Sequence, residues 1–277
     1  MTRPSAGDLA HAADRLEAAL RDADARWAKA VEIVPEAEST QDEAFARASG
    51  SSGLVLIAER QTGGRGRLGR VWADDRGLGL AVTIVLRNVR PEHLAIASGV
   101  AACRAIESLT GNDVDAYAHV GLRWPNDAVV RSGPLEPRKL AGVLIEKRDN
   151  LTLLGIGVNV LQGEGDWPDE LRARAASVRQ LADAFDVARP ITRADVAEAL
   201  LRELAAMIRS DDDTLAWHAQ RADVLRGSTR TFTSAGRTFT GHVERILPTR
   251  GIVLRLDDGS EVELPAATTS LVHDVGA

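Results

Sequence analysis

The sequence predicts a mixed α/β domain followed by a small all-β domain. Helical and strand patterns alternate through roughly the first 225 residues. Two apolar runs, Leu140–Ile145 and Leu151–Val160, flank the polar residues 147–150, which predicts an antiparallel hairpin. From Thr229 onward the pattern changes to short alternating runs with turn signals such as Asp257-Asp258-Gly259. This change predicts a terminal domain of about five strands.

The first half of the chain predicts two helices and two strands in order. Apolar residues recur at helical spacing over residues 8–30, which predicts one helix. Leu54–Ala58 is a continuous apolar run after a Ser/Gly cluster, and therefore a buried strand. A second strand is expected near Leu80–Leu86. A helix is expected from Pro91, because proline is tolerated in a first helical turn, to Leu109.

The second half adds one strand before the hairpin and two helices after it. Apolar and polar residues alternate over 120–124, which predicts a half-buried strand that Pro125 ends. Residues 192–208 and 215–225 carry helical patterns.

Composition and charge exclude several functional classes. No run approaches the ~18 apolar residues that a membrane span needs. The first 30 residues carry five acidic side chains, unlike a secretion signal. The net charge of −6 argues against non-specific binding to nucleic acid. Cys103 has no cysteine to pair with in the chain, which favours a reducing compartment. We expect a cytoplasmic protein that binds neither membranes nor nucleic acid.

The most informative segment is Gln61–Trp72, here called the Arg/Gly loop. From Arg60 to Arg70 there are four arginines and no acid. Glycines let the backbone approach a ligand closely, and guanidinium groups bind phosphate or carboxylate oxygens. We therefore expect a loop that an anionic ligand would order, with Trp72 available to cover a flat heterocycle.

The Arg/Gly loop also permits other interpretations. Gly64, Gly66 and Gly69 match a dinucleotide-binding pattern, but no helix follows and Ile84 stands where that pattern needs an acid. No Gly-Lys pair occurs, which excludes a Walker loop. A solvated basic loop and an RNA-binding segment remain alternatives, the second weakened by the acidic remainder.

Polar residues after the predicted strand at 120–124 and before the hairpin suggest a ligand site. Asn126 is placed to hydrogen-bond a nucleotide, and Asp127 to hold a metal or orient a cation, although both also favour turns. Lys139 would offset the repulsion between a carboxylate and a phosphate, or be an ordinary edge lysine. Gly142 would permit close backbone approach.

Two further segments have both a structural and a functional interpretation. Gly155, Gly157 and Asn159 share one face of their strand, which leaves space for a ligand or for tight helix packing. Thr40 and Glu43 form a Thr-x-x-Glu capping box, whose helix start would also offer polar groups to a ligand.

Together these segments resemble the biotin–protein ligase family, over roughly residues 35–275. The match runs in order through Ser39-Thr40, Gln61–Trp72, Arg123–Asp127, Lys139–Glu146 and Gly155–Asn159. The resemblance implies a mixed, largely antiparallel sheet with flanking helices, like that of class II aminoacyl-tRNA synthetases, followed by a Src-homology-3-like barrel. It divides the chain into an N-terminal helical extension, a catalytic domain and a small β-barrel, at residues 1–34, 35–227 and 228–277.

The resemblance also implies an activity. ATP and biotin would form biotinyl-5'-AMP, and biotin would then pass to a lysine of a biotin carboxyl carrier domain. Mg²⁺ would accompany ATP, and no tightly bound metal is expected. Lipoate–protein ligases are the nearest enzymatic alternative. A non-catalytic module that binds anions or nucleic acid is the alternative from another class.

Site residues follow from the resemblance by position. Biotin would contact Ser39, Thr40, Gln41, Gln61, Arg65, Gly66, Arg67, Lys139 and Gly142. ATP and the adenylate would contact Arg65, Arg67, Arg70, Trp72, Arg123, Asn126, Lys139 and Asn159. Lys139, Arg67 and Asp127 would be catalytic, with Arg67 retaining the intermediate and Asp127 holding the metal.

Two departures from the family pattern shape these expectations. Arg123 stands where relatives usually have lysine, which changes the cation's geometry. Some relatives carry an N-terminal DNA-binding domain, but 38 residues before Ser39 are too few for one, so no transcriptional role is expected.

Overall fold

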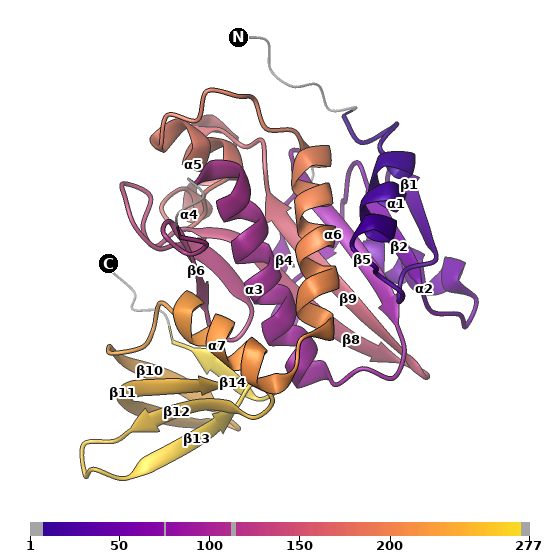
Figure 1. The fold of residues 1–277 in the computed structure, drawn as a ribbon. Coiled ribbons are helices and arrows are strands. Elements are labelled where there is room, and N and C mark those ends of the chain that lie inside the picture. Colours follow the sequence, from indigo (N-terminus) through magenta and orange to yellow (C-terminus); the bar gives the residue numbers. More distant parts are fainter. Residues whose placement is uncertain (1–7, 75, 112–114, 273–277) are drawn as a thin grey trace.

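The computed structural model describes residues 8–74, 76–111 and 115–272 and contains a large and a small β-sheet (Figure 1). The seven-stranded sheet has the order β1-β2-β5-β9-β8-β7-β6. Its strands are β1 (Ala30–Val34), β2 (Leu54–Ala58), β5 (Gly79–Leu86), β6 (Val120–Arg123), β7 (Asp127–Val130), β8 (Lys139–Arg148) and β9 (Leu151–Asn159). β1 and β2 are parallel and the other neighbours are antiparallel, which confirms the predicted mixed, largely antiparallel sheet.

Helices flank the large sheet and connect it to the small one. They are α1 (Ala13–Asp22), α2 (Thr40–Ala48), α3 (Pro91–Thr110), α4 (Asp169–Arg172), α5 (Val178–Ala184), α6 (Arg193–Arg209) and α7 (Asp212–Ala222). α3 and α6 lie side by side across one face of the sheet (Figure 1). None of the helices among the described residues is long and apolar enough to cross a membrane.

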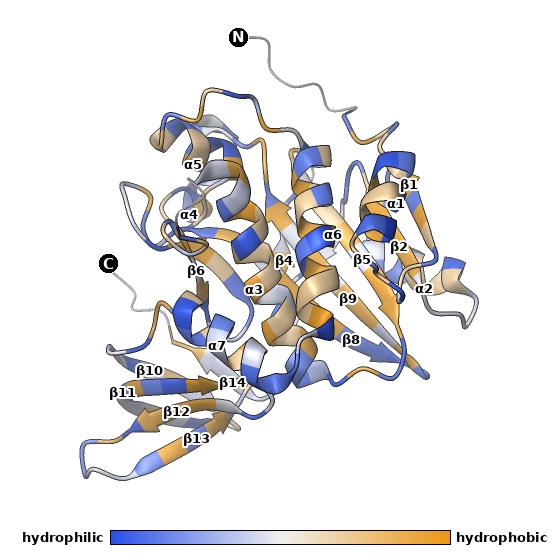
Figure 2. Cartoon of the chain, in the orientation of Figure 1, coloured by the Kyte–Doolittle hydropathy of each residue, from blue (hydrophilic) through white to orange (hydrophobic). Residues whose placement is uncertain are grey.

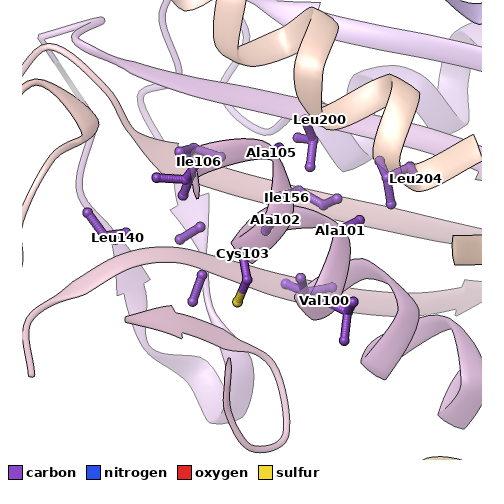
Figure 3. Close-up of a cluster of buried hydrophobic side chains, with 14 of the residues drawn as sticks. Val100, Ala101, Ala102, Cys103, Ala105, Ile106, Leu140, Ile156, Leu200 and Leu204 are labelled. Atoms are coloured by element: carbon purple, nitrogen blue, oxygen red, sulfur yellow. The ribbon is translucent and has the colours of Figure 1, made fainter. Parts of the chain in front are cut away.

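The two faces of the large sheet belong to different apolar clusters, as the period of two in a strand requires. On β9, Leu154, Ile156 and Val158 join the main core with α3 and α6. Figure 3 shows Val100 and Cys103 of α3 and Leu200 and Leu204 of α6 gathered near Ile156. Burial raises the pKa of the Cys103 thiol, so this cysteine is a core side chain and not a reactive one.

The opposite face of the sheet is covered more sparsely. Leu56 of β2 and Leu153 of β9 pack there with Ala44 of α2 in a smaller cluster. Toward the end of β9 this face is formed by Gly155 and Gly157, which line a pocket. A region of the sheet is therefore left for the site described below.

The small sheet has five strands, as the sequence predicts, in the order β13-β12-β11-β10-β14. They are β10 (Thr229–Ser234), β11 (Arg237–Leu247), β12 (Gly251–Arg255), β13 (Glu261–Pro265) and β14 (Thr269–Leu271). All neighbours are antiparallel. Figure 2 shows apolar and polar residues interleaved along these strands. Phe232 is fully buried against Trp124, with ring centroids 6.1 Å apart, so the small domain packs on the large one.

Two expectations for the N-terminal part are wrong. The helix predicted over residues 8–30 is limited to α1, because the chain turns at Asp24, whose φ is +50°. The sequence analysis also missed β1, which lies before the predicted boundary at residue 35 and yet is the edge strand of the large sheet.

Candidate active site

A pocket opens on the sheet face opposite α3 and α6, between the start of α2, strands β8 and β9, and the Arg/Gly loop. Its empty space is about 490 Å³, open to solvent. The predicted biotin-contacting residues all line it, together with Trp72 and Asn126. Those residues are Ser39, Thr40, Gln41, Gln61, Arg65, Gly66, Arg67, Lys139 and Gly142.

Glycines in the sheet give room to the larger side chains of the site. A Cβ atom on Gly157 would lie 2.5 Å from the Trp72 ring, and one on Gly155 would lie 3.1 Å from Gln41. A Cβ atom on Gly142 would lie 2.7 Å from Lys139 Nζ. Because α3 and α6 cover the other face, packing against those helices does not explain these glycines. They let Trp72, Gln41 and Lys139 lie directly against the strands.

A buried chain of hydrogen bonds organises the start of α2. Gln61 Oε1 accepts from the Thr40 backbone N–H at 2.8 Å and from Thr40 Oγ1 at 2.9 Å. Thr83 Oγ1 donates to Thr40 Oγ1 at 2.9 Å. Gln41 Nε2 donates to the carbonyls of Leu144 and Leu153, both at 3.3 Å. These contacts fix the polar end of the pocket and connect the Arg/Gly loop to α2.

The predicted capping box is wrong. The N-cap residue is Ser39, and Thr40 is already the first helical residue. The Thr40 backbone N–H donates to Gln61 Oε1 and not to the Glu43 carboxylate, and the Glu43 backbone N–H donates to the Ser39 carbonyl and not to the Thr40 hydroxyl. The side chain of Gln61, distant in sequence, therefore satisfies the helix start instead.

Lys139 lies in the pocket with a half-buried counter-ion beside it. Its Nζ is 2.7 Å from Asp127 Oδ1, and Arg123 Nη2 donates to Asp127 Oδ2 at 3.1 Å. Burial opposes ionisation of Asp127, but the charges of Lys139 and Arg123 outweigh it and lower the pKa of Asp127. Lys139 Nζ also lies 5.4 Å from the Trp72 ring centroid. The Lys139 ammonium group therefore lies against Trp72, the ring that is expected to cover the nucleotide.

The Arg/Gly loop is a small folded unit. β3 (Gly64–Arg65) pairs with β4 (Val71–Trp72), and a 3₁₀ turn, η1 (Arg67–Gly69), joins them. Leu68 takes a left-handed conformation, with φ +57°, and its side chain is 71% exposed. The turn therefore directs Arg65, Gly66 and Arg67 toward the pocket while Leu68 faces solvent.

Arg65 belongs to a four-charge cluster made by Asp42, Arg65, Glu146 and Arg148. Arg65 donates to both oxygens of Asp42 at 2.6 and 3.0 Å and to Glu146 at 3.4 Å. Arg148 lies 2.6 Å from Asp42 and 2.7 Å from Glu146. Hydrogen bonding from Arg65 lowers the pKa of Asp42 to about 2. The cluster connects the loop to α2 and to β8.

Arg67 is held in a different way, by uncharged oxygens. Its Nη1 donates to Asn126 Oδ1 at 3.2 Å, and its Nη2 donates to the carbonyls of Ala266 at 2.7 Å and Thr269 at 3.2 Å. Asn126 Nδ2 in turn donates to the Val143 carbonyl at 2.6 Å. Burial lowers the pKa of Arg67 from its ordinary value, yet an arginine keeps its charge near neutral pH.

Four predicted nucleotide or metal residues lie outside the pocket lining: Arg70, Arg123, Asp127 and Asn159. The Asn159 amide donates to the backbone carbonyls of Lys139 and Ala176, both at 3.1 Å, and thus supports the strand that carries Lys139. Arg70 is exposed on the loop. Both oxygens of Asp127 face cations, Lys139 and Arg123, and its role as a metal ligand stays a prediction. Among the described residues, no group of three or more acidic, histidine or cysteine side chains could hold a metal ion.

Three charged residues of the site are not predicted from the sequence: Asp42, Glu146 and Arg148. Nor are the two carbonyl groups of the small domain that hold Arg67. No local pattern marks these groups, because their partners are distant in sequence.

Fold and site together define an acyl-activating ligase of the biotin/lipoate type. The model of the Biotin/lipoate A/B protein ligase family matches residues 33–162. The chain is 36% identical over 204 residues to the biotin–[acetyl-CoA-carboxylase] ligase of Mycobacterium tuberculosis, covering 69% of this chain and 70% of that protein. The chain belongs to the biotin–protein ligase family.

Other similar proteins agree with this placement. The chain is 34% identical over 155 residues to a bifunctional ligase/repressor of Bacillus subtilis, covering 52% of this chain and 44% of that longer protein. Among solved structures, biotin protein ligase from Aquifex aeolicus in complex with biotin and ATP matches with a TM-score of 0.71 at 24% identity, covering 88% of this chain and 99% of that one. The biotin protein ligase of Leishmania major in complex with biotinyl-5-AMP matches with a TM-score of 0.59 at 22% identity, covering 85% and 98%. These likenesses establish the fold.

Proposed function

We propose that the protein is an ATP-dependent ligase that activates biotin as biotinyl-5'-AMP and transfers it to a lysine of a carrier protein. The observation that carries this proposal is the position of Lys139. Its ammonium group lies in the pocket, against Trp72 and beside the glycine-lined strands, with Asp127 behind it. The names of the similar proteins given above favour biotin over lipoate as the acyl group.

The first half-reaction brings two anions together. A biotin carboxylate oxygen attacks the α-phosphorus of ATP, a P–O bond forms, and the bond to pyrophosphate breaks. An ammonium group between the carboxylate and the α-phosphate offsets their repulsion and stabilises the developing charge. Asp127 holds the Lys139 ammonium group in place, while the contact with Arg123 gives that half-buried carboxylate a second cation.

The second half-reaction transfers the acyl group. An uncharged carrier lysine attacks the biotinyl carbonyl carbon and releases one N–H proton to solvent as the amide bond forms. AMP leaves with the electron pair of the cleaved C–O bond. We assign retention of the adenylate to Arg67, since its guanidinium lines the pocket at the loop. We assign the biotin head group to the polar end formed by Ser39, Thr40 and Gln61.

The nucleotide side of the site is also a proposal. Trp72 presents a flat ring at the pocket, and Asn126 holds Arg67 beside it. Because Asp127 is engaged with two cations, we propose that magnesium enters with ATP and is bound by phosphate oxygens and water, a usual arrangement for Mg²⁺.

We propose a biotin carboxyl carrier domain as the acceptor, and a cytoplasmic location. The acceptor follows from the carboxylase in the name of the Mycobacterium tuberculosis relative. Residues 35–227 would form the catalytic domain, with β1 added to its sheet, and residues 228–277 the small β domain.

Biotin-dependent exchange of labelled pyrophosphate into ATP tests the proposal. We expect exchange with biotin, ATP and magnesium together, and none when lipoate replaces biotin. Exchange with lipoate alone would support the lipoate ligase alternative. Absence of exchange, combined with tight retention of DNA or RNA at ~0.15 M salt, would instead support an anion-binding module.

A further inference from the structure

Backbone carbonyl groups of the small β domain contact Arg67, a residue that lines the pocket. The turn between β13 and β14 places the carbonyl oxygens of Ala266 and Thr269 against Arg67 Nη2, at 2.7 and 3.2 Å. Arg67 lies in the Arg/Gly loop, far from these two residues in the sequence. The two hydrogen bonds join residues that are 199 and 202 positions apart. A side chain of the catalytic loop is thus oriented by the other domain.

The uncharged nature of the three acceptors distinguishes Arg67 from its neighbours. Arg65 is neutralised by Asp42 and Glu146, and Lys139 by Asp127. Across residues 8–74, 76–111 and 115–272, no carboxylate lies within ion-pair distance of Arg67. Neutral oxygens can orient a guanidinium group without cancelling its charge. Asp127, whose charge also acts on Arg67, lies beyond ion-pair distance and is engaged by Lys139 and Arg123, so the charge of Arg67 remains available to an anion in the pocket.

The donor geometry leads to the same conclusion. A guanidinium group has five N–H donors in a fixed planar arrangement. Both donors of Arg67 Nη2 are used by the small domain, and one donor of Nη1 by Asn126. Within the part of the chain that the structure describes, Nε–H and the second Nη1–H have no acceptor and are left for a ligand. Because the group is planar, fixing Nη2 also fixes the direction of those two donors.

The turn that carries the two carbonyl groups is bonded to the small sheet. Thr269 is fully buried, and its hydroxyl donates to Ser234 Oγ at 2.9 Å. β14 pairs with β10 in the register Ser234–Thr269, and the Ala235 backbone N–H donates to the Thr268 carbonyl at 3.3 Å. The turn is therefore part of the small sheet. That sheet packs on the large domain through the contact between Phe232 and Trp124.

We propose that the small β domain is a positioning element for adenylate retention: the Ala266 and Thr269 carbonyls aim the charge of Arg67 into the pocket. This inference rests on the proposed function for the identity of the retained anion. The orientation of Arg67 by the small domain is independent of that identity. Displacing the turn should release the activated intermediate while leaving Lys139 and the chemistry of its formation in place.

A one-glycine insertion between Ala267 and Thr268 tests the proposal, because it shifts the two carbonyls relative to each other. The matched control is a one-glycine insertion between Asp258 and Gly259, at the other end of β13. We expect the first insertion to speed release of biotinyl-5'-AMP by about tenfold or more, the factor expected when hydrogen bonds to a charged group are lost. Pyrophosphate exchange should change less than about threefold, and the control should behave as the unmodified chain. A folded insertion variant that releases the intermediate at the unmodified rate would overturn the proposal.

A double-mutant cycle with Arg67→Lys sharpens the test. The lysine keeps the charge but cannot reproduce the planar set of donors, so it should also speed release. Adding the insertion to Arg67→Lys should then change the release rate little further. If the insertion instead speeds release by the same factor in both backgrounds, the turn does not act through Arg67. If the insertion prevents folding, Arg67→Lys decides alone, since retention at the unmodified rate would contradict the proposal.

Hydrogen exchange of the ligand-free protein separates this proposal from the proposed function. The backbone amides of residues 64–70 should exchange faster in the insertion variant than in the control insertion. That result would support the positioning role even if biotin failed to drive pyrophosphate exchange. Unchanged protection, with biotin-dependent exchange intact, would overturn the positioning role and leave the proposed function standing.

Discussion

Lys139 and Asp127 form the charged centre of the site, with Nζ and Oδ1 2.7 Å apart. Replacing Lys139 with alanine removes the cation that eases the approach of carboxylate and phosphate. We expect adenylate formation to fall by about 100-fold or more, the range seen for one preorganised donor. Asp127 keeps its contact with Arg123, so the free energy of unfolding should fall by only about 1–2 kcal/mol. Pyrophosphate exchange and chemical denaturation measure the two quantities.

Lys147→Ala is the matched control for this change. Lys147 is an exposed lysine on the same strand, β8. Its replacement should alter neither exchange nor unfolding. If Lys139→Ala lowered activity only in proportion to the folded fraction, Lys139 would be a structural edge residue.

Gly157→Ala tests the placement of Trp72. The added Cβ would lie 2.5 Å from the ring, which must move off the strand. We expect the KM for ATP to rise about tenfold, a factor typical for the loss of one base–aromatic stacking contact, while the KM for biotin changes less. Gly165→Ala is the control, because nothing lies within 4 Å of a Cβ at that position. An unchanged KM for ATP in a folded Gly157→Ala variant would remove Trp72 from the nucleotide site.

The elements of the fold that sequence analysis predicted are those whose apolar pattern is local. The strand Leu54–Ala58 has the predicted bounds, because it is one continuous apolar run. The hairpin of β8 and β9 follows from two apolar runs separated by a polar turn. β1 was missed because Glu32 interrupts a short apolar run at the sheet edge, where one side of the strand is not fully covered. Propensity over five residues is too weak a signal to identify such a strand.

The residues of the site also differ in whether a local sequence pattern marks them. Arg67 and Lys139 could be identified because they lie in distinctive local strings, but their partners could not. Asp127 was expected to hold a metal, and only the antiparallel pairing of β6, β7 and β8 shows that it faces Arg123 and Lys139. The carbonyl of Ala266 has no sequence signal at all, because every residue has one.

Asp42→Asn tests whether the four-charge cluster holds the Arg/Gly loop against α2. The pKa of Asp42, about 2, lies below its ordinary value, so its ion pairs are fully formed above about pH 4 and are lost as the pH falls toward 2. At neutral pH the amide should weaken the hold on Arg65 and raise the biotin dissociation rate severalfold. Because the Asp42 side chain is about half exposed, the stability change should stay within about 1 kcal/mol. Stopped-flow binding measures the rate.

The control for Asp42→Asn lies one residue further along α2. Glu43 also pairs with an arginine, Arg47, but away from the loop. Glu43→Gln should leave biotin dissociation unchanged at low and high salt. Equal effects of the two substitutions would show that general surface charge, and not the cluster, governs biotin release.

Asp223→Asn should stabilise the protein at neutral pH, and the effect should depend on pH in a defined way. Asp223 is 6% exposed, just after α7 in the connection to the small domain. Its Oδ1 accepts from the Leu225 backbone N–H at 2.8 Å, whereas Oδ2 has no hydrogen-bond partner among the described residues. Burial raises the pKa of Asp223 to about 6. The folded protein therefore binds this proton more tightly than the unfolded chain does.

The sign of the pH dependence follows from that difference. The cost of ionising Asp223 is absent below about pH 4, grows between pH 4 and 6, and is constant above. Asparagine keeps the oxygen that accepts from Leu225 and carries no charge. It should raise the free energy of unfolding at pH 7.5 by up to about 3 kcal/mol and leave it nearly unchanged at pH 4. Urea denaturation at the two pH values measures this, with Asp257→Asn, at an exposed turn, as the control. A gain of equal size at both pH values would mean that relief of the buried charge is not its cause.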